Sequence, residues 1–240
     1  MPGERVFLTA EWRALVMLNY EVNPDPLLEY VPPGTELDCW RGKAFVSLVG
    51  FQFLRTRVFG IRFPSHSNFD EVNLRFYVRR WEGNENRRGV VFIREIVPRR
   101  AIAVIARAFY NEQYVACPMR HAVELNSSRS HAAYNWKSGT GWNKITLAAT
   151  GKRLLPEEGS LEKFITEHYW GYSRARGSGC VEYRVEHPQW RIWSATNAAF
   201  EGDAAEPYGK DWVEVFTQKP SSAFLAGGSG VSVYRGTIHR

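Results

Sequence analysis

The chain has 240 residues, of which 44% are hydrophobic and 23% are charged, an ordinary globular composition that excludes a disordered or fibrous chain. Its 31 Lys and Arg residues exceed its 25 Asp and Glu residues by only six and are scattered among them, which favours a solvated surface and no nucleic-acid partner. No apolar stretch approaches the ~18 residues of a membrane span, and residues 1–5 lack the pattern of a signal peptide, so we expect a cytoplasmic protein without a membrane partner.

Short alternating runs between Gly, Pro and Asn turns predict a mainly β protein with a few short helices. The predicted strands are 12–22, 37–40, 44–53, 72–80, 90–97, 114–125, 130–137, 142–150, 169–174, 181–186, 190–197, 213–217 and 231–236. Strands 37–40 and 44–53 are expected to form a hairpin, and the polar loop 82–88 should connect the next two strands. With no repeat and no linker in the sequence, residues 1–240 are expected to form a single domain.

Four helical segments are predicted from caps and helix-forming residues. Asp25 and Pro26 favour a short helix over 27–31, and Pro98 with an alanine-rich run favours a helix over 99–111. Ser160 is a suitable N-cap for a helix over 161–166, and residues 204–208 fit one further helical turn. The glycine-rich stretch 227–230 is interpreted as a turn before the last strand.

Several common site signatures are missing. The three cysteines, Cys39, Cys117 and Cys180, are odd in number and far apart, which favours reduced and mostly buried thiols over a disulfide framework. The six histidines show no zinc-type pairing, and residues 227–230 lack a phosphate-binding lysine or a dinucleotide fingerprint. We therefore expect no metal and no cofactor.

The strand around residues 71–78 carries an unusual polar row. Its alternation places four hydrogen-bonding side chains on one face, namely Glu71, Asn73, Arg75 and Tyr77. A solvated sheet face usually carries Lys, Thr and Glu instead, so this row is equally consistent with the wall of a ligand pocket.

A second group of charges lies at the end of the next strand. Arg94 and Glu95 precede Pro98, and Arg99 falls on the first turn of the predicted helix, where a cation opposes the helix dipole. An anion between the arginine and the helix N-terminus would remove this penalty. Glu95, a ligand carboxylate or a ligand phosphate could supply that anion, and the internal salt bridge to Glu95 is the more common arrangement.

Tyrosine, tryptophan and histidine side chains cluster at three further places. Tyr110 ends the predicted helix, and His168 lies in the densest aromatic cluster, directly after Glu167. The third cluster contains Tyr183, His187 and Trp190. Such aromatic side chains, interleaved with Arg, either pack in the core or stack on nucleic-acid bases, and the core is favoured. A histidine beside a glutamate is also a candidate general base.

The order of several sequence blocks resembles the YqjF-like family, an uncharacterised bacterial group. The blocks are 8–12, 18–20, 31–38, 46–51, 71–78, 89–98, 110–112, 118–121, 164–172 and 186–188. They extend over nearly the whole chain. The resemblance implies a fold similar to acetoacetate decarboxylase, an antiparallel, cone-shaped β-barrel with the active site inside.

The same resemblance argues against the decarboxylase reaction itself. Those decarboxylases use a lysine as a Schiff-base nucleophile, and the corresponding segment here, 95–100, ends in Arg99 and Arg100. A guanidinium stays protonated and is no amine nucleophile, although its planar fork binds carboxylates well.

We therefore predict a β-cone that binds a small carboxylate metabolite. The predicted ligand-binding residues are Glu71, Asn73, Arg75, Tyr77, Arg99 and Tyr110, and the candidate catalytic residues are Glu95, Arg94 and His168. The chemistry would be a lyase or hydratase reaction without a Schiff base. The alternative is a non-catalytic ligand sensor or protein-interaction module, and homo-oligomerisation stays open.

Overall fold

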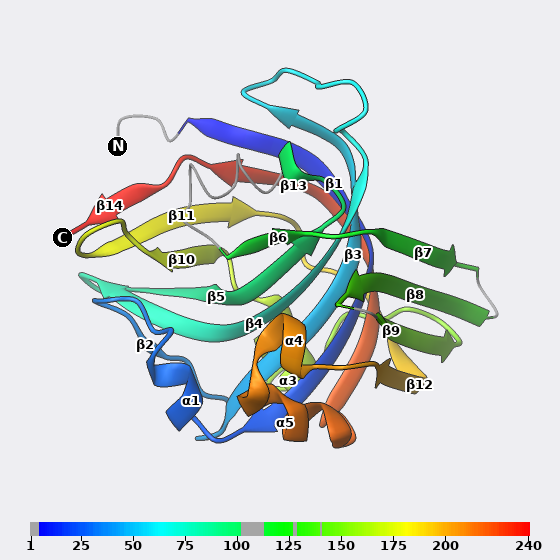
Figure 1. Ribbon diagram of the computed structural model, residues 1–240. Coiled ribbons are helices and arrows are strands. Elements are labelled where there is room, and N and C mark those ends of the chain that lie inside the picture. The colour runs from blue at the N-terminus through cyan, green and yellow to red at the C-terminus, as the bar shows by residue number, and fades with distance from the viewer. Residues whose placement is uncertain (1–4, 102–112, 127–128, 140) are drawn as a thin grey trace.

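Strands dominate the computed structural model, which describes residues 5–101, 113–126, 129–139 and 141–240 (Figure 1). The strands are β1 Val6–Val22, β2 Glu36–Leu37, β3 Ala44–Val58, β4 Phe69–Glu82, β5 Glu85–Val97, β6 Tyr114–Ala116, β7 Met119–Glu124, β8 Arg129–Ser138, β9 Gly141–Thr150, β10 Trp170–Arg174, β11 Cys180–Glu186, β12 Ile192–Glu201, β13 Ser222–Tyr234 and β14 Thr237–His239. The helical elements are α1 Asp25–Leu28, α3 Leu161–Thr166, α4 Ala205–Tyr208, the 3-10 turn η1 Lys210–Trp212 and α5 Val213–Thr217. The predicted mainly β class is confirmed.

Part of the sheet closes on itself. Neighbouring strands follow the order β11, β10, β5, β4, β3, β1 and β13, and β13 pairs again with β11 through Val185 opposite Val233. This pairing joins both ends of the path into a ring of strands. The sheet continues from β13 through β12, β9, β8 and β7, which form a wing beside the ring (Figure 1).

The two faces of the ring strands have different roles. On β4, Val72, Leu74 and Phe76 pack in one large cluster with Tyr134 and Trp136 of the wing strand β8. Strand side chains alternate with a period of two, so the intervening residues of β4 point to the opposite face, inside the ring. The main core therefore supports the ring from outside and leaves the inner face for a site.

Strand β1 bends where it passes β13. Ala14 has a φ of 53°, and the register with β3 shifts between Arg13 and Val16. Gly228 of β13, with a φ of 77°, lies opposite Arg13, and a Cβ on it would approach the carbonyl oxygen of Trp12 to 1.9 Å. Only glycine combines this backbone conformation with this close approach.

We expect Gly228→Ala to lower the free energy of unfolding by about 3 kcal/mol, because both the backbone conformation and the contact with Trp12 become strained. Gly230→Ala is the matched control two residues further along β13, where a Cβ meets no atom within 4 Å. It should cost less than about 1 kcal/mol. Urea unfolding of both variants measures the difference, and equal costs would contradict this account of the bend.

Three predicted helices form at or near the predicted places, and one predicted strand is a helix instead. Helix α3 has the predicted bounds, and the hydroxyl of Ser160 accepts a hydrogen bond from the Lys163 amide at 3.1 Å. Helices α1 and α4 form near the predicted places. Residues 213–217 form helix α5 instead of a strand, because a helical turn places Trp212 and Phe216, four residues apart, on one buried face.

Several predicted strand boundaries were also wrong. Strand β2 pairs with β4 and not with β3, and residues 227–230 lie within β13. The expected loop 82–88 is reduced to a two-residue turn at Gly83 and Asn84, since β4 and β5 pair up to Glu82 and Glu85. Residues 114–125 form two strands, β6 and β7, which are separated at Cys117 and Pro118.

The predicted helix over 99–111 lies largely outside the described residues. Arg100 and Ala101 are helical in the described part. The cysteines are free thiols, as predicted, but only Cys180 is fully buried. Within the described residues, no helix has the length and apolar character to cross a membrane.

Candidate functional site

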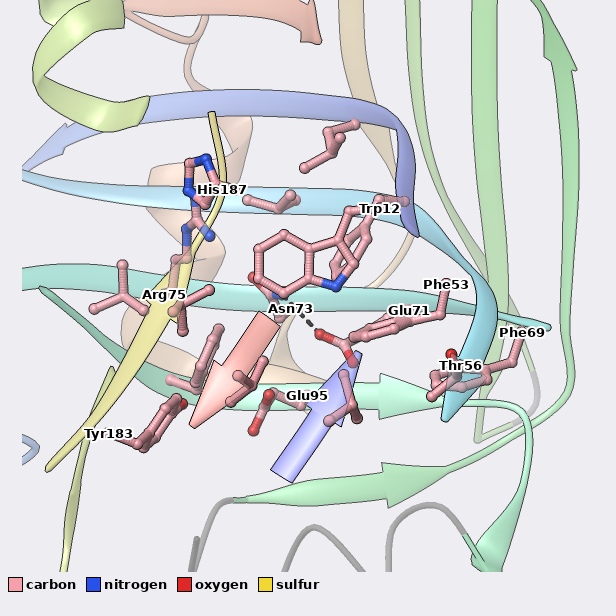
Figure 2. Close-up of a pocket in the computed structure, with 18 of the residues that line it drawn as sticks. Trp12, Phe53, Thr56, Phe69, Glu71, Asn73, Arg75, Glu95, Tyr183 and His187 are labelled. Atoms are coloured by element: carbon pink, nitrogen blue, oxygen red, sulfur yellow. Dashed lines mark hydrogen bonds between the residues drawn. The ribbon is translucent and has the colours of Figure 1, made fainter. Parts of the chain in front are cut away.

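A cavity of about 290 Å³ lies inside the ring (Figure 2). All the ring strands contribute side chains to its wall, most of them aromatic or aliphatic. Besides these apolar and aromatic side chains, the polar lining residues are Thr56, His66, Glu71, Asn73, Arg75, Glu95, Thr166, His168 and His187. A largely apolar wall with a few convergent polar groups is typical of small-molecule sites.

The polar row of β4 forms part of this wall. Glu71, Asn73 and Arg75 point into the cavity and are 2%, 1% and 9% exposed. Tyr77 shares their face but is not among the lining residues. Its ring packs against His168 at 4.6 Å, and its hydroxyl hydrogen-bonds with Ser47.

An irregularity in β5 decides which of two neighbouring residues faces the cavity. Leu74 of β4 pairs with Arg94, whereas the next residue, Arg75, pairs with Phe92, so β5 contains an extra residue. Phe92 and Glu95 both line the cavity as a result. The Arg94 Nε instead donates to the carbonyl oxygen of Pro207 at 3.0 Å, beside α4. The structure thus separates Arg94 from Glu95.

Two further predicted residues lie away from the described wall. Arg99 is half-buried and is not among the lining residues. Tyr110 lies outside the described residues. Of the arginines predicted to bind a ligand or take part in catalysis, Arg75 is the one that the structure brings to the cavity.

Glu71 is a buried carboxyl group with two hydrogen-bond donors. The Asn73 Nδ2 donates to one oxygen at 3.0 Å, and the Tyr114 hydroxyl donates to the other at 3.2 Å. Burial raises the pKa of Glu71 to about 7, although both donors and the charge of Arg75 act to lower it. Near neutral pH this group therefore exists in both protonation states.

Arg75 carries an uncompensated charge beside Glu71. Within the described residues it forms no ion pair or hydrogen bond, and its Nε is buried without a partner. The Oδ1 of Asn73 and the Nε1 of Trp12 are also buried without partners in the described part of the chain. Buried polar groups usually have hydrogen-bond partners, so these atoms are free to bind a ligand.

His168 is held by a carboxylate far away in the sequence. Its Nε2 lies 3.0 Å from the Oδ2 of Asp38, and the Nε of Arg88 donates to the same oxygen at 2.6 Å. Burial by itself raises the pKa of Asp38, but the hydrogen bonds from His168 and Arg88 outweigh this effect and lower it. The sequence suggested Glu167 as the partner, yet Glu167 accepts from the Tyr169 hydroxyl.

The protonation state of His168 follows from this contact. Burial lowers its pKa to about 4, so the ring is neutral at neutral pH. Because the ionised Asp38 can only accept, we assign the proton to Nε2, which leaves Nδ1 as an acceptor. Within the described residues, Nδ1 has no hydrogen-bond partner.

Sequence reasoning did not assign Asp38, Trp12 and His187 to the site, although it noted His187 in an aromatic cluster. His187 lines the cavity near Arg75, and its ring stacks on Trp190 at 4.1 Å (Figure 2). Burial, with a smaller effect of Arg75, lowers the pKa of His187. No local pattern links these residues to β4, because only the closed ring brings their strands together.

The comparison with known families identifies the chain. Residues 9–229 match the model of a family described as an uncharacterized conserved protein, DUF2071. The chain belongs to this family. The uncharacterized protein YqjF of Bacillus subtilis (strain 168) is 28% identical over 204 residues, which cover 79% of this chain and 75% of the relative. The predicted YqjF-like resemblance is confirmed.

Solved structures with the same fold come from the acetoacetate decarboxylase group. The acetoacetate decarboxylase of Legionella pneumophila has a TM-score of 0.67 at 14% identity, over 100% of this chain and 92% of that chain. An acetoacetate decarboxylase-like enzyme from Sphingomonas wittichii RW1 has a TM-score of 0.65 at 14% identity, over 98% and 93%. The enduracididine biosynthesis enzyme MppR, complexed with pyruvate, has a TM-score of 0.67 at 14% identity, over 99% and 91%. At these identities the similarity shows the fold, and it confirms the predicted one.

The side chains of this family member limit the chemistry of the cavity. All seven lysines of the chain lie among the described residues, and none of them lines the cavity. Within the same residues, no group of three or more His, Cys, Asp or Glu side chains is placed to hold a metal ion. In the described wall, the ionisable groups that remain for chemistry are a guanidinium, two carboxyls, imidazoles and the phenols of Tyr114 and Tyr183.

Proposed function

We propose that the cavity binds a small carboxylate through Arg75. The observation that carries this proposal is the unpaired guanidinium, which is nine-tenths buried in the cavity wall. A buried charge without a partner is costly, and a planar carboxylate offers two acceptors that match the guanidinium fork. The side-chain oxygen of Asn73 and the Nδ1 of His168 add hydrogen-bond acceptors for the polar substituents of such a ligand.

The two carboxyls suit proton transfer on this ligand. Glu71 has a pKa of about 7, where an acid or base works best at neutral pH, and Glu95 lies across from Asn73 on the neighbouring strand. In the elimination of water from a hydroxy acid, one carboxylate accepts a proton from the carbon next to the ligand carboxylate, and a carbon–carbon double bond forms. The second carboxyl protonates the departing hydroxyl, so that water leaves. Arg75 would stabilise the negative charge that develops in between.

A Schiff base is not part of this proposal. The imine route needs an amine in the cavity, and no lysine lines it in the described part of the chain, which includes every lysine. Borohydride reduction in the presence of a β-keto acid should therefore leave the protein mass unchanged. A reduced adduct on any lysine would contradict the proposed chemistry.

The test is a thermal-shift screen with small oxo and hydroxy acids, each beside its neutral amide. A carboxylate that occupies the cavity at 100 times its Kd should stabilise the protein by about 2.7 kcal/mol, whereas the amide should not. Carboxylates that leave the melting temperature unchanged would contradict the proposal.

Turnover of the binding acids in deuterated buffer, followed by NMR, then separates an enzyme from a sensor. We expect Glu95→Gln to reduce turnover at least about 100-fold while ligand binding remains. Binding without any proton exchange or product would favour the non-catalytic ligand sensor.

A further inference from the structure

The inner face of β4 carries Arg75 at one end of the cavity wall and Phe69 at the other. Phe69, Glu71, Asn73 and Arg75 follow one another on the inner face of β4. A strand rises about 3.3 Å per residue, so Phe69 and Arg75 lie roughly 20 Å apart along the backbone. The carboxylate-binding group is therefore at one end of the wall and an aromatic ring is at the other.

Three rings gather at the Phe69 end of this face. Phe53 stacks on Phe69, with ring centroids 4.7 Å apart and planes at 16°. Trp12 meets Phe53 edge-on at 5.8 Å. In Figure 2, Phe53 and Phe69 lie on one side of Trp12, whereas Arg75 and His187 lie on the other side. A ligand held by Arg75 would thus extend past Trp12 toward Phe53 and Phe69.

A small polar acid would use only part of this wall. A ligand such as pyruvate could engage Arg75, but it would make no contact with the cavity faces of the Trp12, Phe53 and Phe69 rings. Burying an apolar group against them adds affinity in proportion to its area, and flat rings gain further from edge-to-face and offset contacts. The cavity volume of about 290 Å³ is near the lower limit of about 300 Å³ for drug-sized ligands, which is enough for one ring and a short acid chain.

We propose that the ligand is an aryl-substituted carboxylate, with its carboxylate on Arg75 and its ring against Trp12, Phe53 and Phe69. This inference rests on the proposed carboxylate binding and names its ligand class. The order of side chains along β4 also predicts a short chain between ring and carboxylate, beside Glu71 and Asn73, where the proposed proton transfer takes place.

The test compares four probes by isothermal titration calorimetry on the full chain. They are 3-phenylpropionate, its fully reduced ring analogue 3-cyclohexylpropionate, propionate, and the neutral 3-phenylpropanamide. We expect 3-phenylpropionate to bind at least about 30-fold more tightly than propionate and a few-fold more tightly than the cyclohexyl acid. The amide should bind at least about 30-fold more weakly than 3-phenylpropionate.

A pair of variants assigns the ring to its place. Phe53→Leu should reduce the preference for 3-phenylpropionate over propionate at least about fivefold and leave the affinity for propionate unchanged. Phe45→Leu is the matched control, because Phe45 is a buried phenylalanine of the same strand that does not line the cavity. Its preference should equal that of the unmodified protein. The preference ratio separates recognition from a general loss of stability.

The outcomes distinguish this inference from the proposal on which it rests. If propionate binds as tightly as 3-phenylpropionate, the aryl class is wrong while carboxylate binding stands. If the preference is the same in the Phe53→Leu and Phe45→Leu variants, the ring does not lie against Phe53, and the inference is again overturned. If neither acid binds, carboxylate binding fails and the ligand class fails with it.

Discussion

Replacing Arg75 by methionine is expected to raise the Kd for a bound carboxylate at least about 100-fold, or about 3 kcal/mol. Arg75 is the one Lys or Arg side chain in the described cavity wall, and no protein anion is bound to it. No other lysine or arginine of that wall can therefore replace its contact with the ligand carboxylate. Methionine keeps much of the side-chain length and fills the space without a charge. Calorimetric titration of 3-phenylpropionate into both proteins measures the loss.

Arg79→Met is the control for this substitution. Arg79 lies on the same strand, is partly exposed, and pairs with Glu36 at 2.8 Å, away from the cavity. This variant should bind the ligand as the unmodified protein does and lose less than about 1 kcal/mol of stability.

The stability of the Arg75→Met variant is a second, independent readout. Burying a cation without a partner costs free energy, so its removal should leave the free energy of unfolding unchanged or increase it. A variant that folds at least as well as the unmodified protein but no longer binds carboxylates is the expected combination. Retained affinity in a folded variant would refute the role of Arg75.

The strand β4 illustrates what the sequence could predict. Its polar row alternates with Val72, Leu74 and Phe76, and a period of two is a local property that survives in the folded sheet. The face occupied by Glu71 could therefore be identified before its environment was known. Whether that face met solvent or a cavity depended on the ring closure between β11 and β13, which involves residues far apart in the sequence.

Strand β5 and His168 illustrate what the sequence could not predict. One extra residue in β5 turns Arg94 away from the cavity while Glu95 stays in it, and nothing in that run of residues marks the irregularity. In the sequence, His168 lies between Glu167 and Tyr169. Its hydrogen-bond partner is instead Asp38, 130 positions earlier. Sequence patterns predict which way a side chain points on one strand, and they do not predict contacts between distant segments.

The opposite pKa shifts of two cavity residues predict a pH dependence of stability that single variants should reveal. The pKa of Glu71 is raised from 4.5 to about 7 on folding. Between these values the folded protein binds more protons than the unfolded chain, so the free energy of unfolding falls as pH rises, by at most about 3 kcal/mol. The pKa of His168 is lowered from 6.5 to about 4, which makes the folded protein bind fewer protons and the free energy of unfolding rise with pH.

In the unmodified protein these two effects oppose each other between pH 4.5 and 6.5. The Glu71→Gln variant removes the falling contribution, so its free energy of unfolding should rise with pH across this window, by about 1–3 kcal/mol relative to the unmodified protein. The His168→Gln variant removes the rising contribution and should show the opposite slope. Urea unfolding at half-unit pH steps measures both slopes.

The variant Glu157→Gln, at an exposed loop carboxyl, controls for the loss of one acidic residue and should reproduce the pH profile of the unmodified protein. The double variant Glu71→Gln/His168→Gln should also return toward that profile, because both opposing contributions are then absent. If Glu71→Gln alone leaves the slope unchanged, Glu71 ionises in the folded protein as it does in the unfolded chain. Glu71 would then be a fully ionised carboxylate at neutral pH, able to accept a proton but not to donate one, and the acid–base role proposed for it would fail at that point.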